Sequence, residues 1–433
     1  MNRGFYTILA AQFFSALADN ALLFAAIALL ASVNAQAWQT PVLQQFFVFA
    51  YIVLAPFVGP FADSLPKGRV MFVSNAVKLL GCIAMLMGMH PLLAYGLVGV
   101  GAAMYSPAKY GILTEYLPHQ KLVLANGWME GLTVAAIILG SILGGIMVSN
   151  KFADYVFARA DFPLIETGID TPPELAITVI LMFYFIAALI NLYIPKVAID
   201  HKLQKRNPVF IMQDFWHSFR LLWRDPLGQV SLAVTTLFWG VGATLRLIVL
   251  TWASMALKFN LEMATQLTAV VAVGIALGSV LAAKYVSLKR AVRVLPVGIA
   301  MGLLVVTMVF VSDWRIAIVL LVLIGAMGGY FVVPMNALLQ HRGHLLMGAG
   351  HSIAVQNFNE QLCILAMLAV YSILLSMNIH INIVIWIFGA LVLVLMAAIM
   401  YWNRLNHLQN PNLDRIIGMK KGESDSHFVA NPH

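Results

Sequence analysis

The amino-acid sequence predicts an all-α polytopic membrane protein, with twelve transmembrane helices arranged as two six-helix pseudo-repeats. Hydrophobic residues make up 61% of the chain and charged residues 10%, a composition that soluble domains do not have. Apolar stretches long enough to cross a bilayer as helices recur along the whole chain. A shift of 227 positions places polar residues of the second half on polar residues of the first half.

The apolar stretches predict twelve spans, some with Gly and Pro inside them, which helices in lipid tolerate. The first follows Met1 to Gly4 without a small-residue cleavage site, so we expect a retained helix and not a signal peptide. The predicted spans are 6–32, 43–62, 70–89, 92–114, 122–148, 175–195, 229–257, 263–287, 292–311, 315–338, 351–376 and 381–402.

The distribution of basic residues predicts that both termini are cytoplasmic. With the amino terminus inside, the outer segments hold only four basic residues: Lys151, Arg159, Lys258 and Arg315. The inner segments hold nineteen: Arg3, Lys67, Arg69, Lys121, Lys196, Lys202, Lys205, Arg206, Arg220, Arg224, Lys284, Lys289, Arg290, Arg293, Arg342, Arg404, Arg415, Lys420 and Lys421. The net charge of +8 is therefore explained by topology and anionic lipid, and no nucleic-acid partner is needed.

The spans divide into two halves, residues 1–195 and 228–402, followed by a polar tail at 403–433. The segment 196–227 between them contains FIMQDFWHSFRLLWRDP, whose interleaved basic and aromatic residues predict an amphipathic helix on the membrane surface. The segment 149–174 is the longest predicted outer loop, and its role stays open.

A carboxylate lies near the middle of the first span, at Asp19 beside Asn20. Such a charge costs a few kcal/mol or more in the bilayer, so it must face protein or water. Gln12 and Ser15 share its helix face at spacings of three and four. Two interpretations remain: a charge that braces helices, or a functional group.

The two halves match in register. The 227-residue shift places Asp19 on Arg246 and Lys109 on Asn336, among other pairs. Parallel repeats around a central site are typical of secondary transporters, although a chance match is the alternative. Equivalent midspan positions are expected to face each other, so we predict that Asp19 and Arg246 pair or share a bound group.

The segment between the second and third spans has the pattern Gly-x-x-x-Asp followed by Gly-Arg, at Gly59, Asp63, Lys67, Gly68 and Arg69. An acid at a helix end with basic residues beyond it can lock and release neighbouring helices. The pattern resembles the loop motif of the major facilitator superfamily, which implies a gating role. A turn that carries positive charge only for topology is the alternative.

Further segments resemble the bacterial lysophospholipid transporters of that superfamily. They are Asp19 to Phe24, Ser106 to Leu113, Thr244 to Arg246, Val333 to Gln340 and Ala354 to Asn357. The resemblance implies a flippase of the bacterial inner membrane that moves single-chain phospholipids, such as lysophosphatidylethanolamine, from the outer to the inner leaflet by alternating access. It also implies coupling to an acyltransferase joined to an acyl-carrier-protein synthetase, and no cofactor.

The predicted substrate-binding residues combine cations, acids and amides, which suits a zwitterionic head group. They are Asp19, Asn20, Lys109, Glu130, Arg246, Asn336, Gln340, Gln356, Asn359 and Glu360. Lys78 is left out of this set, because we interpret it as a lysine that extends to the inner surface.

Other classes fit less well. No acyltransferase His-x-x-x-x-Asp and no phosphate-binding Gly-Lys-Ser/Thr motif occurs, so an enzyme is not expected. His341, His344 and His351 are explained by a solvated inner loop better than by a metal site. The main alternative is a proton-coupled drug or small-molecule antiporter of the same superfamily, in which Asp19 and Glu360 carry protons.

Overall fold

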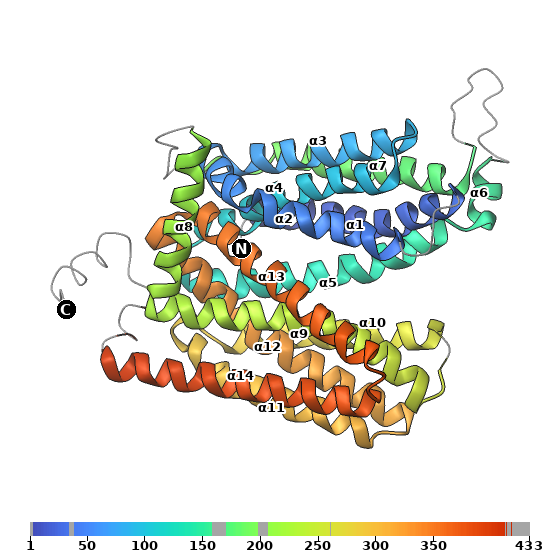
Figure 1. The fold of residues 1–433 in the computed structure, drawn as a ribbon. Coiled ribbons are helices and arrows are strands. Elements are labelled where there is room, and N and C mark those ends of the chain that lie inside the picture. Colours follow the sequence, from blue (N-terminus) through green and yellow to red (C-terminus); the bar gives the residue numbers. More distant parts are fainter. Residues whose placement is uncertain are drawn as a thin grey trace. The chain divides into compact units, whose positions relative to one another are not determined.

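A computed structural model describes residues 3–33, 39–157, 170–197, 207–259, 261–411, 413 and 417, and in these residues it contains helices and no strand (Figure 1). Parts of the outer loop 149–174, the segment 196–227 and the tail therefore lie outside the described residues. The longer helices are α1 (Arg3–Ser32), α2 (Gln39–Ser64), α3 (Lys67–Leu86), α4 (Pro91–Tyr116), α5 (Leu122–Met147), α6 (Asn150–Phe157), α7 (Pro172–Leu192), α8 (Pro208–Arg224), α9 (Pro226–Ala256), α10 (Leu261–Tyr285), α11 (Leu295–Thr307), α12 (Trp314–Met347), α13 (Ala349–Ser376) and α14 (Ile381–Gln409).

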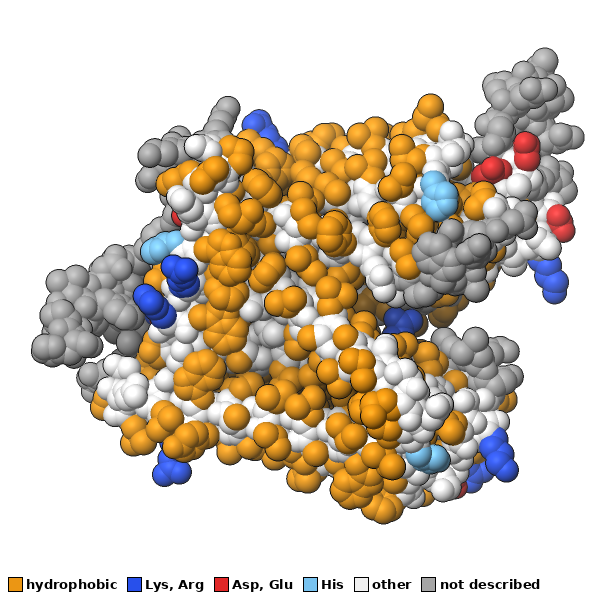
Figure 2. Space-filling view, in the orientation of Figure 1, with side chains coloured by type: hydrophobic (Ala, Val, Ile, Leu, Met, Phe, Trp, Pro, Cys, Tyr) orange, Lys and Arg blue, Asp and Glu red, His pale blue; other side chains and the backbone are white. Residues whose placement is uncertain are grey.

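The helices confirm the predicted all-α membrane class. Within the described residues, 11 helical segments are long and apolar enough to cross a membrane. With the 26-residue α4 they make the twelve predicted spans. Hydrophobic side chains cover most of the face drawn in Figure 2, as expected for a surface that meets lipid.

Helix α12 runs to Met347, well past the predicted end at 338. The apolar pattern stops there, but the polar residues Gln340, His341 and Arg342 that follow are buried inside the protein, so the helix continues. His341, with 5% of its surface exposed, is one of them. The expectation that His341, His344 and His351 lie in a solvated loop was wrong, because all three are on α12 or α13 and none is exposed.

The chain forms two compact units. Unit 1 comprises 1–112 and 135–211, and unit 2 comprises 113–134 and 212–433. In unit 1, α7 packs against α1 and α3, and its buried Ile180 and Tyr184 belong to one hydrophobic core with Leu22 and Ala25 of α1.

In unit 2, α10 and α12 approach closely through glycines. A Cβ atom built on Gly278 would lie 1.9 Å from the Ala326 carbonyl oxygen, and one on Gly329 would lie 2.1 Å from that of Ile275. No side chain fits at these points, so small residues are what allow the two backbones to meet.

The first half of α5 belongs to unit 2. A Cβ atom on Gly127 would lie 2.4 Å from the Cβ of Ala283 in α10. The amides of Asn126 and Gln340 exchange two hydrogen bonds of 2.9 Å between α5 and α12. A pair of amides that satisfy each other in this way holds helices together in lipid.

A buried ion pair joins the start of α9 to α12. Asp225 caps α9, accepting a 2.7 Å hydrogen bond from the Gly228 backbone N–H. Arg342 donates from Nε to Oδ2 at 3.0 Å and from a terminal nitrogen to Oδ1. Both side chains are 2% exposed, so the two-pronged pair leaves neither charge without a partner.

Replacing Arg342 with Met is expected to destabilise the protein by about 3–5 kcal/mol, because it leaves the Asp225 carboxylate buried without its partner. Thermal unfolding of the purified protein in detergent measures the effect. Arg293→Met removes an exposed arginine of the same unit and serves as control. Equal unfolding midpoints for the two variants would contradict the stabilising role of the Asp225–Arg342 ion pair.

Candidate functional site

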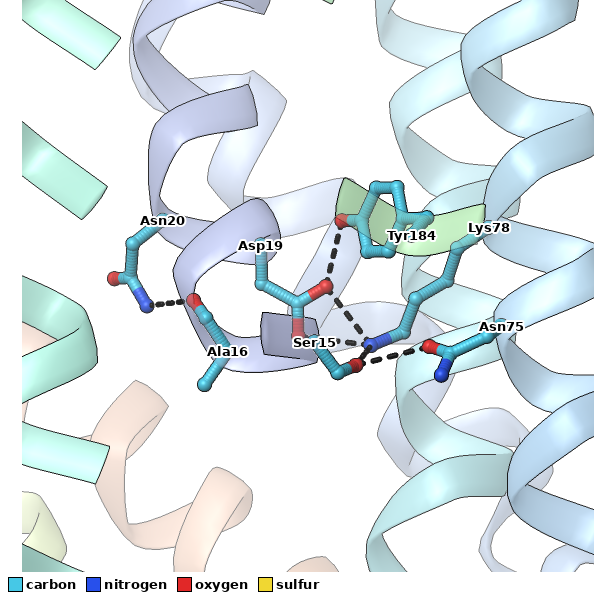
Figure 3. Close-up of polar contacts among 7 residues, drawn as sticks. All are labelled: Ser15, Ala16, Asp19, Asn20, Asn75, Lys78 and Tyr184. Atoms are coloured by element: carbon cyan, nitrogen blue, oxygen red, sulfur yellow. Dashed lines mark hydrogen bonds and ion pairs between the residues drawn. The ribbon is translucent and has the colours of Figure 1, made fainter. Parts of the chain in front are cut away.

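Asp19 of α1 is held by groups from two other helices of unit 1 (Figure 3). The Lys78 ammonium of α3 donates to both carboxylate oxygens at 2.8 Å, and the Tyr184 hydroxyl of α7 donates to one of them at 2.6 Å. Lys78 also donates to the Ser15 hydroxyl at 3.0 Å, and Ser15 donates to the Asn75 side-chain oxygen at 2.9 Å. These five residues form what we call the Asp19 cluster.

The interpretation of Lys78 as a surface-reaching lysine was wrong. Its side chain is 1% exposed, and its ammonium lies 4.8 Å and 5.5 Å from the ring centroids of Tyr105 and Tyr184. Lys78 points inward because Asp19 is there to neutralise it. The signal was present in the sequence, since Ser74, Asn75 and Lys78 make a polar face on α3 like that of α1.

Asp19 and Lys78 differ in how much of each side chain is exposed. The Asp19 side chain is 24% exposed, whereas Lys78 is enclosed. A solute can therefore reach the carboxylate but not the ammonium. Lys78 is the counterion of the acid, and the exposed edge of the carboxylate is an acceptor for a cation or a hydrogen-bond donor.

These contacts give Asp19 a counterion within unit 1, whereas the prediction that Asp19 and Arg246 share a bound group stays a prediction. Asp19 has Lys78 as its counterion, and among the described residues Arg246 makes no ion pair or hydrogen bond. Arg246 belongs to unit 2, on the middle of α9, and is exposed. An exposed guanidinium that has no ion pair within the described residues is suited to bind an anion, and its planar geometry fits a phosphate best.

Four predicted residues come together in unit 2 as a chain of hydrogen bonds between two carboxyl groups. Asn336 donates to Glu130 at 3.5 Å, and Gln356 donates to Asn336 at 3.0 Å and to Glu360 at 2.7 Å. All four are buried. The side-chain oxygen of Gln356 is buried and has no hydrogen-bond partner within the described residues, so it remains an acceptor for a donor group.

Two other predicted residues bond to their own helices, and a third lies against a neighbouring ring. Asn20 donates to the Ala16 carbonyl at 2.7 Å, and Asn359 donates to the Val355 carbonyl at 2.8 Å, each on its own helix. The Lys109 ammonium lies 4.4 Å from the ring centroid of the adjacent Tyr110. Gln340 bonds to Asn126, as described above. The sequence therefore predicted the polar positions, but not which of them meet.

The predicted gating residues surround the turn between α2 and α3. Lys67 donates to Asp63 and to the Ala62 carbonyl, both at 2.7 Å, and the ion pair is buried. Gly68 lies against the end of α7, where an added Cβ would be 2.9 Å from the Asn191 carbonyl oxygen. Gly59 is buried and Arg69 is exposed.

Comparison with known proteins shows the family. A family model described as Major Facilitator Superfamily matches residues 8–365. The chain belongs to the major facilitator superfamily. Among superfamily structures, the chain is similar to FucP in the outward conformation, with a TM-score of 0.71 and 14% identity over 93% of this chain and 98% of that one. It is also similar to a bacterial homologue of the iron transporter ferroportin, with a TM-score of 0.70 and 15% identity over 93% and 100%.

Sequence relatives within the superfamily are much closer. The lysophospholipid transporter LplT of Yersinia enterocolitica is 44% identical over 380 residues, which are 88% of this chain and 89% of that protein. The transporter of the same name from Yersinia pestis is 44% identical over 379 residues, or 87% and 88%. The solved structures support the fold alone, and the relatives identify the branch.

The unequal burial of Asp19 and Lys78 predicts unequal effects of removing them. Asp19→Asn leaves an enclosed ammonium without a counterion and should cost about 3–5 kcal/mol, whereas Lys78→Met leaves a partly exposed carboxylate and should cost less. The double variant Asp19→Asn with Lys78→Met should recover most of the stability, because no buried charge remains. Thermal unfolding of all three in detergent tests this, and a double variant no more stable than Asp19→Asn would count against it.

Proposed function

We propose that this superfamily member transports lysophospholipids across the bacterial inner membrane, from the outer to the inner leaflet. The observation that carries the proposal is its 44% identity, over 88% of the chain, with a protein named as a lysophospholipid transporter. Specific recognition of such a lipid needs groups for its head, since a single acyl chain is recognised by apolar contact alone. Each unit supplies such groups.

In unit 1, the exposed edge of the Asp19 carboxylate is suited to accept hydrogen bonds from the ammonium of an ethanolamine head group. In unit 2, Arg246 is suited to a phosphate, and the buried oxygen of Gln356, which has no hydrogen-bond partner within the described residues, is suited to a hydroxyl or an ammonium. Asn20, Lys109, Glu130, Asn336, Gln340, Asn359 and Glu360 complete the proposed set of binding residues. The buried chain from Glu130 to Glu360 fixes the direction of the Gln356 amide.

For the conformational cycle, we propose that the turn formed by Gly59, Asp63, Lys67, Gly68 and Arg69 acts as a gate. The buried Asp63–Lys67 pair bridges the ends of α2 and α3, and Gly68 brings the turn against α7. Movement of α7 away from this turn would uncover the pair. Its charges would then exchange partners instead of becoming unpaired.

The product of inward transport is a lysophospholipid in the inner leaflet, which requires a reacylating enzyme. We propose an acyltransferase joined to an acyl-carrier-protein synthetase as the functional partner. Both termini are proposed to be cytoplasmic, on the strength of the basic residues in the inner segments. The division of the chain into two halves, 1–195 and 228–402, joined by the segment 196–227, stays a prediction.

Labelling tests this topology. Cysteines introduced singly at Lys151 on α6 and at Lys289, both exposed, should react with an impermeant maleimide from opposite sides of the membrane. Lys151 should react in intact cells and Lys289 only in inverted vesicles. Reaction of both positions from one side would overturn the proposed orientation.

Transport by purified protein in vesicles tests the proposed substrate and the role of Asp19. We expect uptake of labelled lysophosphatidylethanolamine and no uptake of a cationic dye; dye uptake alone would favour the proton-coupled antiporter. The double variant Asp19→Asn with Lys78→Met should transport about 10- to 100-fold more slowly, because a charged hydrogen bond to the head group is lost.

The matched control neutralises two exposed charges of α6, with Asp154→Asn and Lys151→Gln, and should transport at the wild-type rate. Wild-type transport by the double variant of Asp19 and Lys78 would mean that this pair only braces α1 against α3. The proposed substrate would stand in that case, but the binding role of Asp19 would not.

A further inference from the structure

Helix α8 carries two different exposed edges on one short helix. Its buried side, formed by Phe215, Ser218 and Leu222, packs on unit 2. Next to that side is an apolar edge with Met212 and Trp216, which are 40% and 43% exposed, followed by the half-buried Phe219 and Trp223. An α-helix turns by 100° per residue, so Arg220 and Arg224 lie next to this edge and opposite the buried side of α8. Both arginines are exposed.

This arrangement matches the boundary of a bilayer. Exposed tryptophan and methionine on a helix that does not cross the membrane are stable where acyl chains begin, and arginines beside them then lie at the depth of phosphate groups. In Figure 2, basic side chains lie beside hydrophobic ones in the region where Figure 1 places α8. The partner that complements both edges is a phospholipid with an anionic head group.

Contacts connect α8 to the helix that carries Gln356 and Glu360. The ring of Phe358 on α13 meets the rings of Phe215, Trp216 and Phe219 edge-on, with centroid distances of 5.5, 6.2 and 6.3 Å. Phe358 is two residues from Gln356 and two from Glu360. Helix α8 therefore packs against the part of α13 that holds the proposed binding residues.

A polar contact strengthens this connection at the start of α13. His351 and the Asp214 carboxylate of α8 lie 3.1 Å apart. The hydrogen bond from His351, opposed by partial burial, lowers the pKa of Asp214 below its usual value, so this carboxylate is ionised at neutral pH. At the other end of α8, Trp223 stacks on Trp402 of α14, with ring centroids 6.3 Å apart.

We propose that α8 is a binding surface for anionic phospholipid head groups, and that lipid bound there modulates transport through α13. Arg220 and Arg224 bind the phosphates, Met212 and Trp216 insert beside them, and Phe358 transmits the position of the helix. The inference goes beyond the proposed function, which it uses only as one of two readouts.

Fluorescence quenching tests the binding surface without any transport measurement. The purified full-length protein is placed in phosphatidylethanolamine vesicles containing brominated phosphatidylglycerol or, separately, brominated phosphatidylethanolamine. The Trp216 signal is the difference between wild type and Trp216→Phe. We expect preferential quenching by the glycerol lipid, with each arginine contributing about fivefold to the preference. Arg220→Gln with Arg224→Gln should abolish it, and Lys289→Gln with Arg290→Gln, a loss of equal charge elsewhere, should keep it.

Lysophosphatidylethanolamine uptake in the same vesicles tests the connection to α13. The wild-type rate should rise severalfold as phosphatidylglycerol is added, and the variant lacking Arg220 and Arg224 should not respond. Phe358→Leu should keep the quenching preference and lose the rate response. Equal quenching of wild type by both brominated lipids would overturn the binding surface, and a rate indifferent to phosphatidylglycerol would overturn its regulatory role.

Discussion

A charge buried away from water, in a membrane span or in the protein interior, needs a partner within the protein, and this requirement organises both units. The cost of an isolated carboxylate or ammonium in hydrocarbon exceeds what helix packing alone recovers. In unit 1 the Asp19–Lys78 ion pair meets the requirement by joining α1 to α3, with Tyr184 of α7 as a third support. In unit 2 the Asp225–Arg342 ion pair joins the start of α9 to α12. The apolar cores are built around these fixed points.

The proposed binding residues make different kinds of polar contact in the two units, an ion pair in unit 1 and a chain of amides in unit 2. The Asp19 cluster is an ion pair with one accessible member, so its charge is balanced before any solute arrives. The unit 2 chain relies on amides that link two acids, and amides reorient at lower cost than charges do. A balanced carboxylate gives a fixed point of recognition, while an amide chain can adjust to hydroxyl or ammonium groups. That combination suits phospholipid head groups, which share a phosphate and differ in the hydroxyl or ammonium group attached to it.

Much of the fold follows from the sequence, because hydropathy and length alone locate helices in lipid. The polar positions of the proposed site were also recognisable, since each interrupts an apolar span. Their partners were not. Lys78 was misjudged because a lysine that extends to the membrane surface and a lysine buried against an acid look alike in sequence without the contact between α3 and α1. Arg342 was assigned to an inner segment, and its burial depends on Asp225, more than a hundred residues earlier. Contacts between distant helices decide such cases.

The ion pair of unit 1 also constrains how the protein is made. Asp19 and Lys78 are 59 residues apart, so α1 leaves the ribosome well before α3. Until α3 arrives, α1 carries a carboxylate whose placement at the bilayer centre costs about 2.5–3.5 kcal/mol. The apolar residues of α1, whose mean hydropathy is 1.9, offset this penalty when the helix enters the membrane. The arrival of Lys78 with α3 then removes the penalty, so the first helix becomes more stable in the membrane only when the third is in place.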